Sequence, residues 1–251
     1  MANRLPLPLR AYRKLSTAAT PLAGLIIRKR LKRGKEDPAR VTERRGLSTL
    51  PRPPGPLVWV HGASVGEVLA VAALVEELQA RGFPVLLTSG TATSAAVAAK
   101  RFPSGVIHQY IPYDAPRFVA RFLDHWRPQL ALFVESDLWP NLILACARRR
   151  VPMVLVNGRM SPRSFPRWQR LSRTIEALLG RFDLCLAQSE TDAARFSALG
   201  GRDVRMTGNL KLDVPAPPAD PSRLDRLLGV TRGREVVVAA STHPGEDETL
   251  L

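Results

Sequence analysis

Three charged residues stand at the ends of apolar segments, where side chains of their type could serve a group-transfer reaction. Glu67 ends the loop HGASVGE, Glu135 opens ESDLWPN, and Lys211 lies within GNLKLD. A carboxylate can take the proton of an attacking hydroxyl, and a lysine can neutralise a departing phosphate. Each also has a structural explanation, since Glu67 can stabilise the first turn of a helix and Lys211 can be a surface lysine. Both explanations stay open on these residues alone.

Two loops of small residues, HGASVGE at 61–67 and TSGTATS at 88–94, suit the binding of an anion. Small side chains let the backbone approach a ligand closely, and the amides of the helices that follow would point at a phosphate. Ser64, Ser89 and Thr91 lie in these loops. The first loop lacks the GxGxxG spacing, so dinucleotide binding is not supported, and a tight turn also explains its glycines.

A second carboxylate, Asp137, follows Glu135, and Arg159 follows the apolar segment that ends in Asn157. Two carboxylates on one rim favour acid-base or cation-stabilising chemistry on a polar substrate, although Asp137 is also a plausible helix N-cap. An arginine in this place suits recognition of a phosphate or carboxylate. Three more arginines follow it, Arg163, Arg167 and Arg170, and a solvated basic face is the more common cause of such a run.

The elements that must position these residues alternate regularly along the chain. Short apolar runs predict strands, and the amphipathic stretches between them predict helices. Seven strands and six helices in strict alternation predict an α/β fold with a doubly wound parallel sheet, whose ligands bind outside the carboxyl ends of the strands. The predicted strands are 57–61, 85–88, 106–110, 130–135, 153–157, 184–188 and 204–207, and the predicted helices are 65–81, 92–101, 116–126, 140–150, 167–179 and 191–199.

Most of the positive charge lies in the first 52 residues. The 251 residues carry a net charge of +15, and residues 1–52 hold 14 cations against 3 anions, or +11. The apolar-leaning stretch Leu15 to Ile27 is too short and too polar to span a bilayer, and a polybasic run at 28–33 follows it. This pattern predicts an arm that docks on an anionic membrane surface. A solvated basic tail is the alternative, and nucleic acid is disfavoured because the remaining residues carry only +4.

A Pro-rich segment at 214–222 predicts a stiff linker after an N-terminal domain at 57–213. Another β-α domain begins at 223–251, with a helix expected at 222–228, a strand at 236–240 and a helix opened by STHPGEDE. About 30 residues are too few to bury a core. We therefore expect the chain to be a truncated piece of a two-domain protein.

The two cysteines, Cys146 and Cys185, each lie in an apolar run without a CxxC partner or a neighbouring histidine. They are predicted to be buried thiols, which argues against a disulfide framework and supports no zinc site. A reducing cytosolic setting is expected.

Seven motifs occur along the chain in a characteristic order: HGASVGE, TSGTATS, ESDLWPN, NGRMS, QSETDAARF, GNLKLD and STHPGEDE. With them, residues 57–251 closely resemble the 3-deoxy-D-manno-octulosonic acid (Kdo) transferases of Gram-negative lipopolysaccharide synthesis. The resemblance implies a B-type glycosyltransferase fold with two Rossmann-like domains, the first complete here and binding the lipid A precursor, the second truncated and binding CMP-Kdo. It also implies residence on the cytoplasmic face of the bacterial inner membrane.

The same resemblance assigns roles to the charged residues. Glu67 is implied to be the proton acceptor for the attacking sugar hydroxyl, and Glu135 and Lys211 are implied to stabilise the transition state. Because cytidine monophosphate leaves as an ionised phosphate, no strong acid is required, and neither a metal nor a cofactor is expected beside the CMP-Kdo donor. Acceptor binding is expected of Ser64, Ser89, Thr91 and Arg159, and donor binding of Ser241, Thr242, His243, Gly245 and Glu246.

The expected function is therefore transfer of Kdo from CMP-Kdo to a lipid A precursor, lipid IVA. A non-catalytic lipid-binding fragment is the alternative, because most of the donor domain is expected to be missing. The expected partners are the lipid A precursor, CMP-Kdo and an anionic membrane surface, with no nucleic acid.

Overall fold

A computed structural model describes residues 5–102, 104–213, 219–243, 245–246 and 248 of the chain. The chain divides into two compact units, Met1–Val214 and Pro215–Leu251, and each is described by itself. The predicted Pro-rich linker at 214–222 lies mostly outside the described residues.

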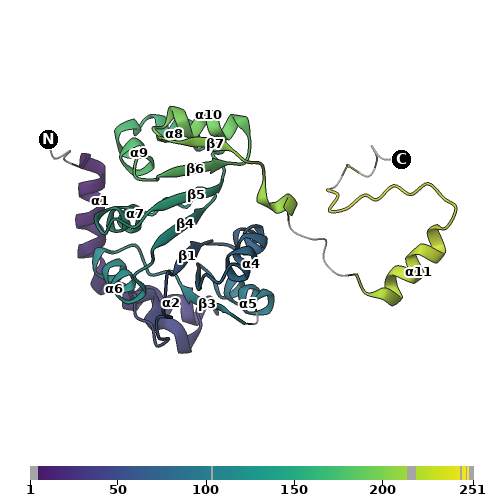
Figure 1. The fold of residues 1–251 in the computed structure, drawn as a ribbon, viewed down its shortest axis with the longest axis horizontal. Helices are drawn as coiled ribbons and strands as arrows, with labels where there is room; N and C mark the ends of the chain where they lie inside the picture. Colours follow the sequence, from purple (N-terminus) through teal and green to yellow (C-terminus); the bar gives the residue numbers. More distant parts are fainter. Residues whose placement is uncertain (1–4, 103, 214–218, 244, 247, 249–251) are drawn as a thin grey trace. The chain divides into compact units, whose positions relative to one another are not determined.

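The first unit is built on a seven-stranded sheet with all neighbours parallel, in the order β3-β2-β1-β4-β5-β6-β7 (Figure 1). The central strands are continuous apolar runs because helices cover both faces of a parallel sheet. Each strand begins and ends within one residue of its prediction, so the predicted α/β class is confirmed. The strands are β1 (Val58–His61), β2 (Val85–Ser89), β3 (Val106–Tyr110), β4 (Leu130–Val134), β5 (Met153–Gly158), β6 (Leu184–Ala187) and β7 (Val204–Met206).

Two helices that the sequence predicts as continuous are each broken. The predicted helix at 65–81 stops at Val71, which is fully buried and has φ −98° and ψ 9°. The break lets Val68 and Val75 on the two short helices both pack on the sheet. The predicted helix at 167–179 is also interrupted, at Leu171, which is exposed and has φ −114° and ψ 37°. The helices are α3 (Val65–Ala70), α4 (Ala72–Ala80), α5 (Ala92–Arg101), α6 (Pro116–Trp126), α7 (Pro140–Arg148), α8 (Phe165–Gln169), α9 (Ser172–Leu179) and α10 (Glu190–Ala198).

The two faces of the sheet carry separate hydrophobic clusters. Helices α3, α4 and α5 cover one face, and α6, α7 and α9 cover the other (Figure 1). In the larger cluster Trp59 on β1 packs against Phe122 and Phe133, with ring centroids 5.0 and 5.3 Å apart. Aromatic pairs at this spacing add to the free energy gained by burying their area.

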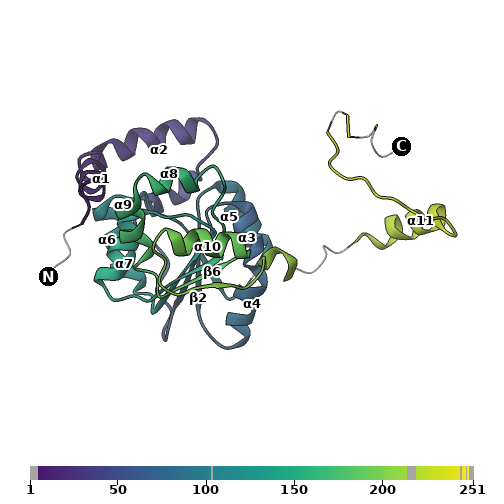
Figure 2. The ribbon, with the colours of Figure 1, turned by 90° about the horizontal axis from the view of Figure 1, so that it is seen from above.

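The basic arm packs against the domain as two helices, α1 (Leu7–Ala18) and α2 (Ala23–Lys32), followed by the 3-10 helix η2 (Pro38–Arg45) (Figure 2). Leu9 and Ile27 are buried, and the Tyr12 hydroxyl donates to Asp114 at 3.0 Å. The outward side of the arm exposes Leu15 and Leu25 by 69% and 62%. In the described part of the chain, no helix has the length and apolar character needed to cross a membrane.

The second unit contains one described helix of more than one turn, α11 (Pro221–Thr231), which Asp220 caps by accepting from the amides of Ser222 and Arg223. The strand predicted at 236–240 is wrong, because these residues form no strand in the structure. Val237 and Val238 are more than 80% exposed, and no strand is described in this unit to pair with them. The helix predicted from STHPGEDE lies partly outside the described residues.

A pair of glycine substitutions tests how tightly the arm is held. Gly46 ends η2 with φ 74°, and a Cβ there would collide with the backbone carbonyl of Phe118 on α6. Gly34 has a similar φ of 62° but open space around it. We expect Gly34→Ala to lower the free energy of unfolding by about 1 kcal/mol and Gly46→Ala by about 3 kcal/mol, because only the second adds overlap with the backbone. Urea unfolding measures both, and equal losses would contradict the packing described.

Candidate functional site

Glu67 lies in the first turn of α3, just beyond the carboxyl end of β1. Ser64 caps this helix by accepting from the Glu67 amide, and the Glu67 side chain folds back over the same turn. Its Oε1 accepts from the Ser64 hydroxyl at 2.8 Å, and its Oε2 accepts from the Ala63 amide at 2.8 Å. Both carboxylate oxygens are therefore held by donors within the loop that carries them.

The surroundings of Glu67 make its carboxylate more basic than a free glutamate. Burial raises the pKa of Glu67, the hydrogen bonds from Ser64 and Ala63 oppose that rise, and the charges of Asp137 and Glu135 add to it. A raised pKa suits a general base, because the carboxylate then binds a proton more strongly than a free glutamate does.

Glu135 and Lys211 are brought together although 76 residues separate them. Lys211 lies in the 3-10 helix η3 (Leu210–Asp213), and its Nζ donates to Glu135 Oε1 at 3.0 Å. Glu135 follows the last residue of β4 with φ 60°, in the left-handed region that only a minority of non-glycine residues adopt. Such strain persists where surrounding contacts fix it, and it is concentrated at functional sites.

Asn157, at the carboxyl end of β5, positions the segment that carries Lys211. Its side chain is buried and its φ is 53°, a conformation that asparagine tolerates better than most residues. Asn157 Oδ1 accepts from the Leu210 amide at 3.0 Å, which fixes the start of η3. We did not predict this role from the sequence; the signal was an Asn-Gly pair at a strand end, where left-handed backbone is common.

A second group of hydrogen-bonded residues surrounds His61, the last residue of β1, and only Asp137 among them is expected from the sequence. His61 is fully buried, with Nδ1 2.9 Å from Thr88 Oγ1 and Nε2 3.2 Å from Asp137 Oδ2. Thr88 Oγ1 also accepts from the Trp59 indole at 2.8 Å, which leaves the threonine proton for His61 Nδ1. A neutral His61 then carries its own proton on Nε2 and donates it to Asp137.

This contact changes the titration of Asp137. Burial by itself would raise the pKa of Asp137, but the hydrogen bond from His61 and the electrostatic attraction of its imidazole ring together bring it below the usual value of 3.8. Asp137 is therefore ionised at every pH at which Glu67 is ionised, and it contributes to the negative potential at this sheet edge.

Two of the predicted acceptor-binding residues are engaged in loop structure. Ser89 is fully buried, where its hydroxyl contacts Ser94 Oγ and His108 Nε2 at 2.9 Å each. Thr91 caps α5 by accepting from the Ser94 amide at 3.0 Å. Contact of either residue with an acceptor stays a prediction.

The other two predicted acceptor-binding residues differ in their freedom to bind. The Ser64 hydroxyl already donates to Glu67, whereas Arg159 is exposed and follows the end of β5. No hydrogen bond or ion pair is described for the Arg159 side chain among the residues that the structure describes.

The predicted donor-binding residues all fall in the second unit. Ser241 has φ 58°, and the His243 amide donates to Glu246 Oε2 at 2.8 Å. All five are exposed: Ser241, Thr242, His243, Gly245 and Glu246.

The edge of the first unit thus combines a base of raised pKa, two further carboxylates and one lysine. Such a set can accept a proton from a hydroxyl, favour a developing positive charge and stabilise a departing anion. Within the described ranges, no three His, Cys, Asp or Glu side chains are grouped so that they could hold a metal ion.

Comparison with known sequences gives a consistent result. The profile of the family described as 3-deoxy-D-manno-octulosonic-acid transferase (kdotransferase) matches residues 39–214. The chain is 35% identical over 246 residues to the 3-deoxy-D-manno-octulosonic acid transferase of Rickettsia bellii, covering 97% of this chain and 58% of the relative. It is 39% identical over 208 residues to that of Bordetella pertussis, covering 80% and 48%. The chain spans about half the length of these relatives.

Solved structures show the fold alone. A complex of S. aureus MnaA with UDP aligns with a TM-score of 0.50 and 15% identity, covering 68% of this chain and 51% of that one. Anabaena Alr3699/HepE in complex with UDP gives a TM-score of 0.50 and 16% identity, covering 70% and 50%. Together with the strand order, this likeness gives the first unit the Rossmann-like fold of an N-terminal glycosyltransferase domain of the B type.

The pair formed by His61 and Asp137 is tested through stability. The pKa of Asp137 is lower in the folded than in the unfolded protein. The ionised side chain therefore adds to the free energy of unfolding at any pH above its unfolded-state pKa. That contribution is lost as the pH falls through the folded-state pKa. We expect Asp137→Asn to lower the free energy of unfolding by about 1 kcal/mol at neutral pH, with the difference narrowing in acid. Asp124→Asn is the control, because Asp124 pairs with Arg149 on the surface. Urea unfolding across a pH series measures both, and a loss independent of pH would contradict the interaction of an ionised Asp137 with His61.

Proposed function

The chain belongs to the Kdo transferase family, and on that premise we propose that it supplies the acceptor-binding half of an enzyme that transfers Kdo from CMP-Kdo to a lipid A precursor, lipid IVA. The observation that carries this proposal is the Glu67 carboxylate, held by two donors at the sheet edge with its pKa raised. If Glu67 only stabilised the first turn of α3, the nearby carboxylates of Asp137 and Glu135 would serve no purpose, because their charges disfavour its ionised form.

The proposed reaction is a displacement at the anomeric carbon of Kdo. The acceptor hydroxyl oxygen forms a bond to that carbon, Glu67 takes the hydroxyl proton, and the bond to the cytidine monophosphate oxygen breaks. The leaving phosphate carries away the electron pair already ionised, so no general acid is needed. Neither a metal nor a cofactor takes part in this scheme.

Glu135 and Lys211 are proposed to act on the charges that develop in this step. The sugar becomes positive as the phosphate departs, which an anionic carboxylate stabilises, and the phosphate gains charge, which a lysine stabilises. Before substrate binds, the two side chains neutralise each other at 3.0 Å, and Lys211 keeps 44% of its side chain exposed. That exposure leaves the ammonium group accessible to a phosphate.

The exposed Arg159 is proposed to meet a phosphate of the acceptor, beside the loops that contain Ser64 and Thr91. Donor binding is proposed for the residues of the second unit that the resemblance assigns to it: Ser241, Thr242, His243, Gly245 and Glu246. The arm is proposed to hold the protein on the cytoplasmic face of the bacterial inner membrane, because it presents exposed leucines beside a run of cations.

The catalytic role of Glu67 is tested with Glu67→Gln in a protein that carries both domains. The variant keeps size but cannot accept the proton, so transfer from CMP-Kdo to lipid IVA should fall by about 100-fold to 10,000-fold. In the parent protein, activity should fall as the pH drops through the pKa of Glu67, which lies above the usual 4.5. Radiolabelled Kdo incorporation measures both.

The matched control is Glu190→Gln, which alters an exposed glutamate in the first turn of α10. It should leave turnover nearly unchanged. Near-normal turnover of Glu67→Gln with lowered stability would show that Glu67 is only a helix cap. Acceptor binding without any transfer by the parent protein would favour the non-catalytic lipid-binding alternative.

Membrane docking is tested on the arm without deleting it, because its buried residues are part of the domain core. Each cation near an anionic surface contributes about 1 kcal/mol, so removing three should weaken vesicle binding at least tenfold. Co-sedimentation with phosphatidylglycerol vesicles, at low and high salt, measures the effect. The arm variant replaces these exposed residues with glutamine: Arg28, Lys29 and Lys32. The control variant replaces exposed cations elsewhere: Arg81, Lys100 and Arg205. Equal weakening by the two variants would contradict docking through the arm.

A further inference from the structure

A chain of three hydrogen bonds leads from the arm to the carboxylate of Glu67. Arg44 Nη2 donates to the Gly90 carbonyl at 2.7 Å, and the Gly90 amide donates to the Ala63 carbonyl at 2.9 Å. The Ala63 amide then donates to Glu67 Oε2 at 2.8 Å. The path joins η2, the loop after β2 and the loop after β1, three segments far apart in the sequence.

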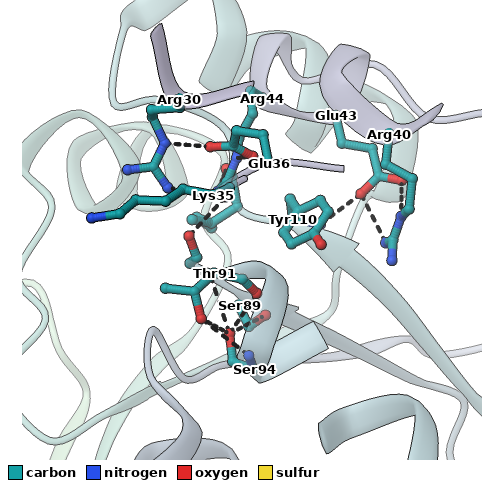
Figure 3. Close-up of polar contacts among 12 residues, drawn as sticks. Arg30, Lys35, Glu36, Arg40, Glu43, Arg44, Ser89, Thr91, Ser94 and Tyr110 are labelled. Carbon is teal, nitrogen blue, oxygen red and sulfur yellow. Dashed lines mark hydrogen bonds and ion pairs between the residues drawn. The ribbon is translucent and has the colours of Figure 1, made fainter. Parts of the chain in front are cut away.

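Arg44 is a rigid starting point for this path. It is 2% exposed, and its Nε donates to Glu36 Oε2 at 3.0 Å while its Nη1 donates to the Ile111 carbonyl at 3.2 Å. Glu36 in turn accepts from Arg30 of α2, as Figure 3 shows. The guanidinium also lies 4.5 Å from the Tyr110 ring centroid. A planar guanidinium that donates in three directions has no freedom to turn.

Gly90 couples Arg44 to Ala63 because the backbone of Ala63 lies close to it. A Cβ on Gly90 would lie 2.8 Å from the Ala63 carbonyl oxygen, a distance that real Cβ atoms essentially never show. The next residue, Thr91, is fixed as the cap of α5 through Ser94 (Figure 3). A shift of the Gly90 carbonyl would therefore shift the Ala63 peptide, which holds Glu67.

We propose that Arg44 is a positioning residue for Glu67, acting through Gly90 and Ala63, so that the docked arm fixes the geometry of the base. The proposal deepens the proposed function, since Glu67 is the base of that reaction. The effect of Arg44 on Glu67 can be measured without an assay of transfer.

Arg44 could instead serve only to hold the arm on the sheet. A substitution of Arg40 distinguishes that role from the positioning of Glu67. Arg40 also belongs to η2 and also forks: its Nε and Nη2 donate to Glu43 at 2.8 and 2.9 Å, and Nη2 donates to the His108 carbonyl at 2.8 Å. It makes no hydrogen bond to Gly90 among the described contacts. Arg40→Lys is therefore the matched control for Arg44→Lys.

The test follows the ionisation of Glu67 by carbon NMR of its carboxyl group in the 251-residue chain, with Glu67→Gln assigning the signal. The groups that face Glu67 are Ser64, Ala63, Asp137 and Glu135. A lysine at position 44 carries its donors on a single nitrogen, which cannot reach the three separate acceptors that the Arg44 guanidinium spans, so the Ala63 amide should hold the carboxylate less firmly. The loss of a donor to the ionised form should raise the pKa of Glu67 by about half a unit.

Arg40→Lys should leave that pKa unchanged. Gly90→Ala tests the same path without altering a buried charge, and it should raise the pKa of Glu67 in the same direction; it decides the question if Arg44→Lys does not fold. A folded Arg44→Lys protein with the pKa of Glu67 unchanged would overturn the proposal. An equal shift in Arg40→Lys would overturn it too, because it would show an effect of the arm in general.

In a protein that carries both domains, Arg44→Lys should lower kcat severalfold with little change in KM for lipid IVA, and the acid limb of the pH profile should move upward with the pKa. A failed transfer assay in the parent protein would count against the proposed function alone. The NMR result on the single chain would still decide the role of Arg44.

Discussion

A carboxylate that acts as a base must be partly shielded from water and also kept in a fixed position, and two donors of its own loop meet both requirements at Glu67. The Ala63 amide and the Ser64 hydroxyl occupy one oxygen each. These hydrogen bonds partly offset the rise in pKa that burial causes. The carboxylate is therefore more basic than a free glutamate and is still stabilised by two donors. The rest of the edge is arranged around a loop that must not move.

The opposite side of the site is fixed by unusual backbone. Glu135 and Asn157 both have positive φ values, at the carboxyl ends of β4 and β5, which are neighbours in the sheet. One turns a carboxylate toward Lys211, and the other accepts from the amide that starts η3. Strain of this kind costs about 1 to 3 kcal/mol per residue, and here the strained residues carry or position the charges of the site.

The arm has two surfaces with different chemistry. Its inner surface contributes Leu9 and Ile27 to hydrophobic packing and Arg44 to a buried polar network, whereas its outer surface keeps leucines and cations in solvent. A buried arginine is costly unless it is paired and hydrogen-bonded, and Arg44 pairs with Glu36 and donates to two carbonyls. The arm is therefore part of the folded domain as well as a candidate membrane contact.

The strands could be predicted from local sequence, because a buried parallel strand is a continuous apolar run and its end is marked by small or polar residues. The sequence also placed Glu67, Glu135 and Lys211 at strand ends. It could not determine the helix break at Val71, since burial on two helices overrides a continuous helical pattern. The pairing of Lys211 with Glu135, the link from His61 to Asp137 and the burial of Arg44 were decided only by tertiary structure. Each joins residues far apart in the chain, and such contacts depend on how the strands are ordered and how closely their loops approach, which local spacing does not encode.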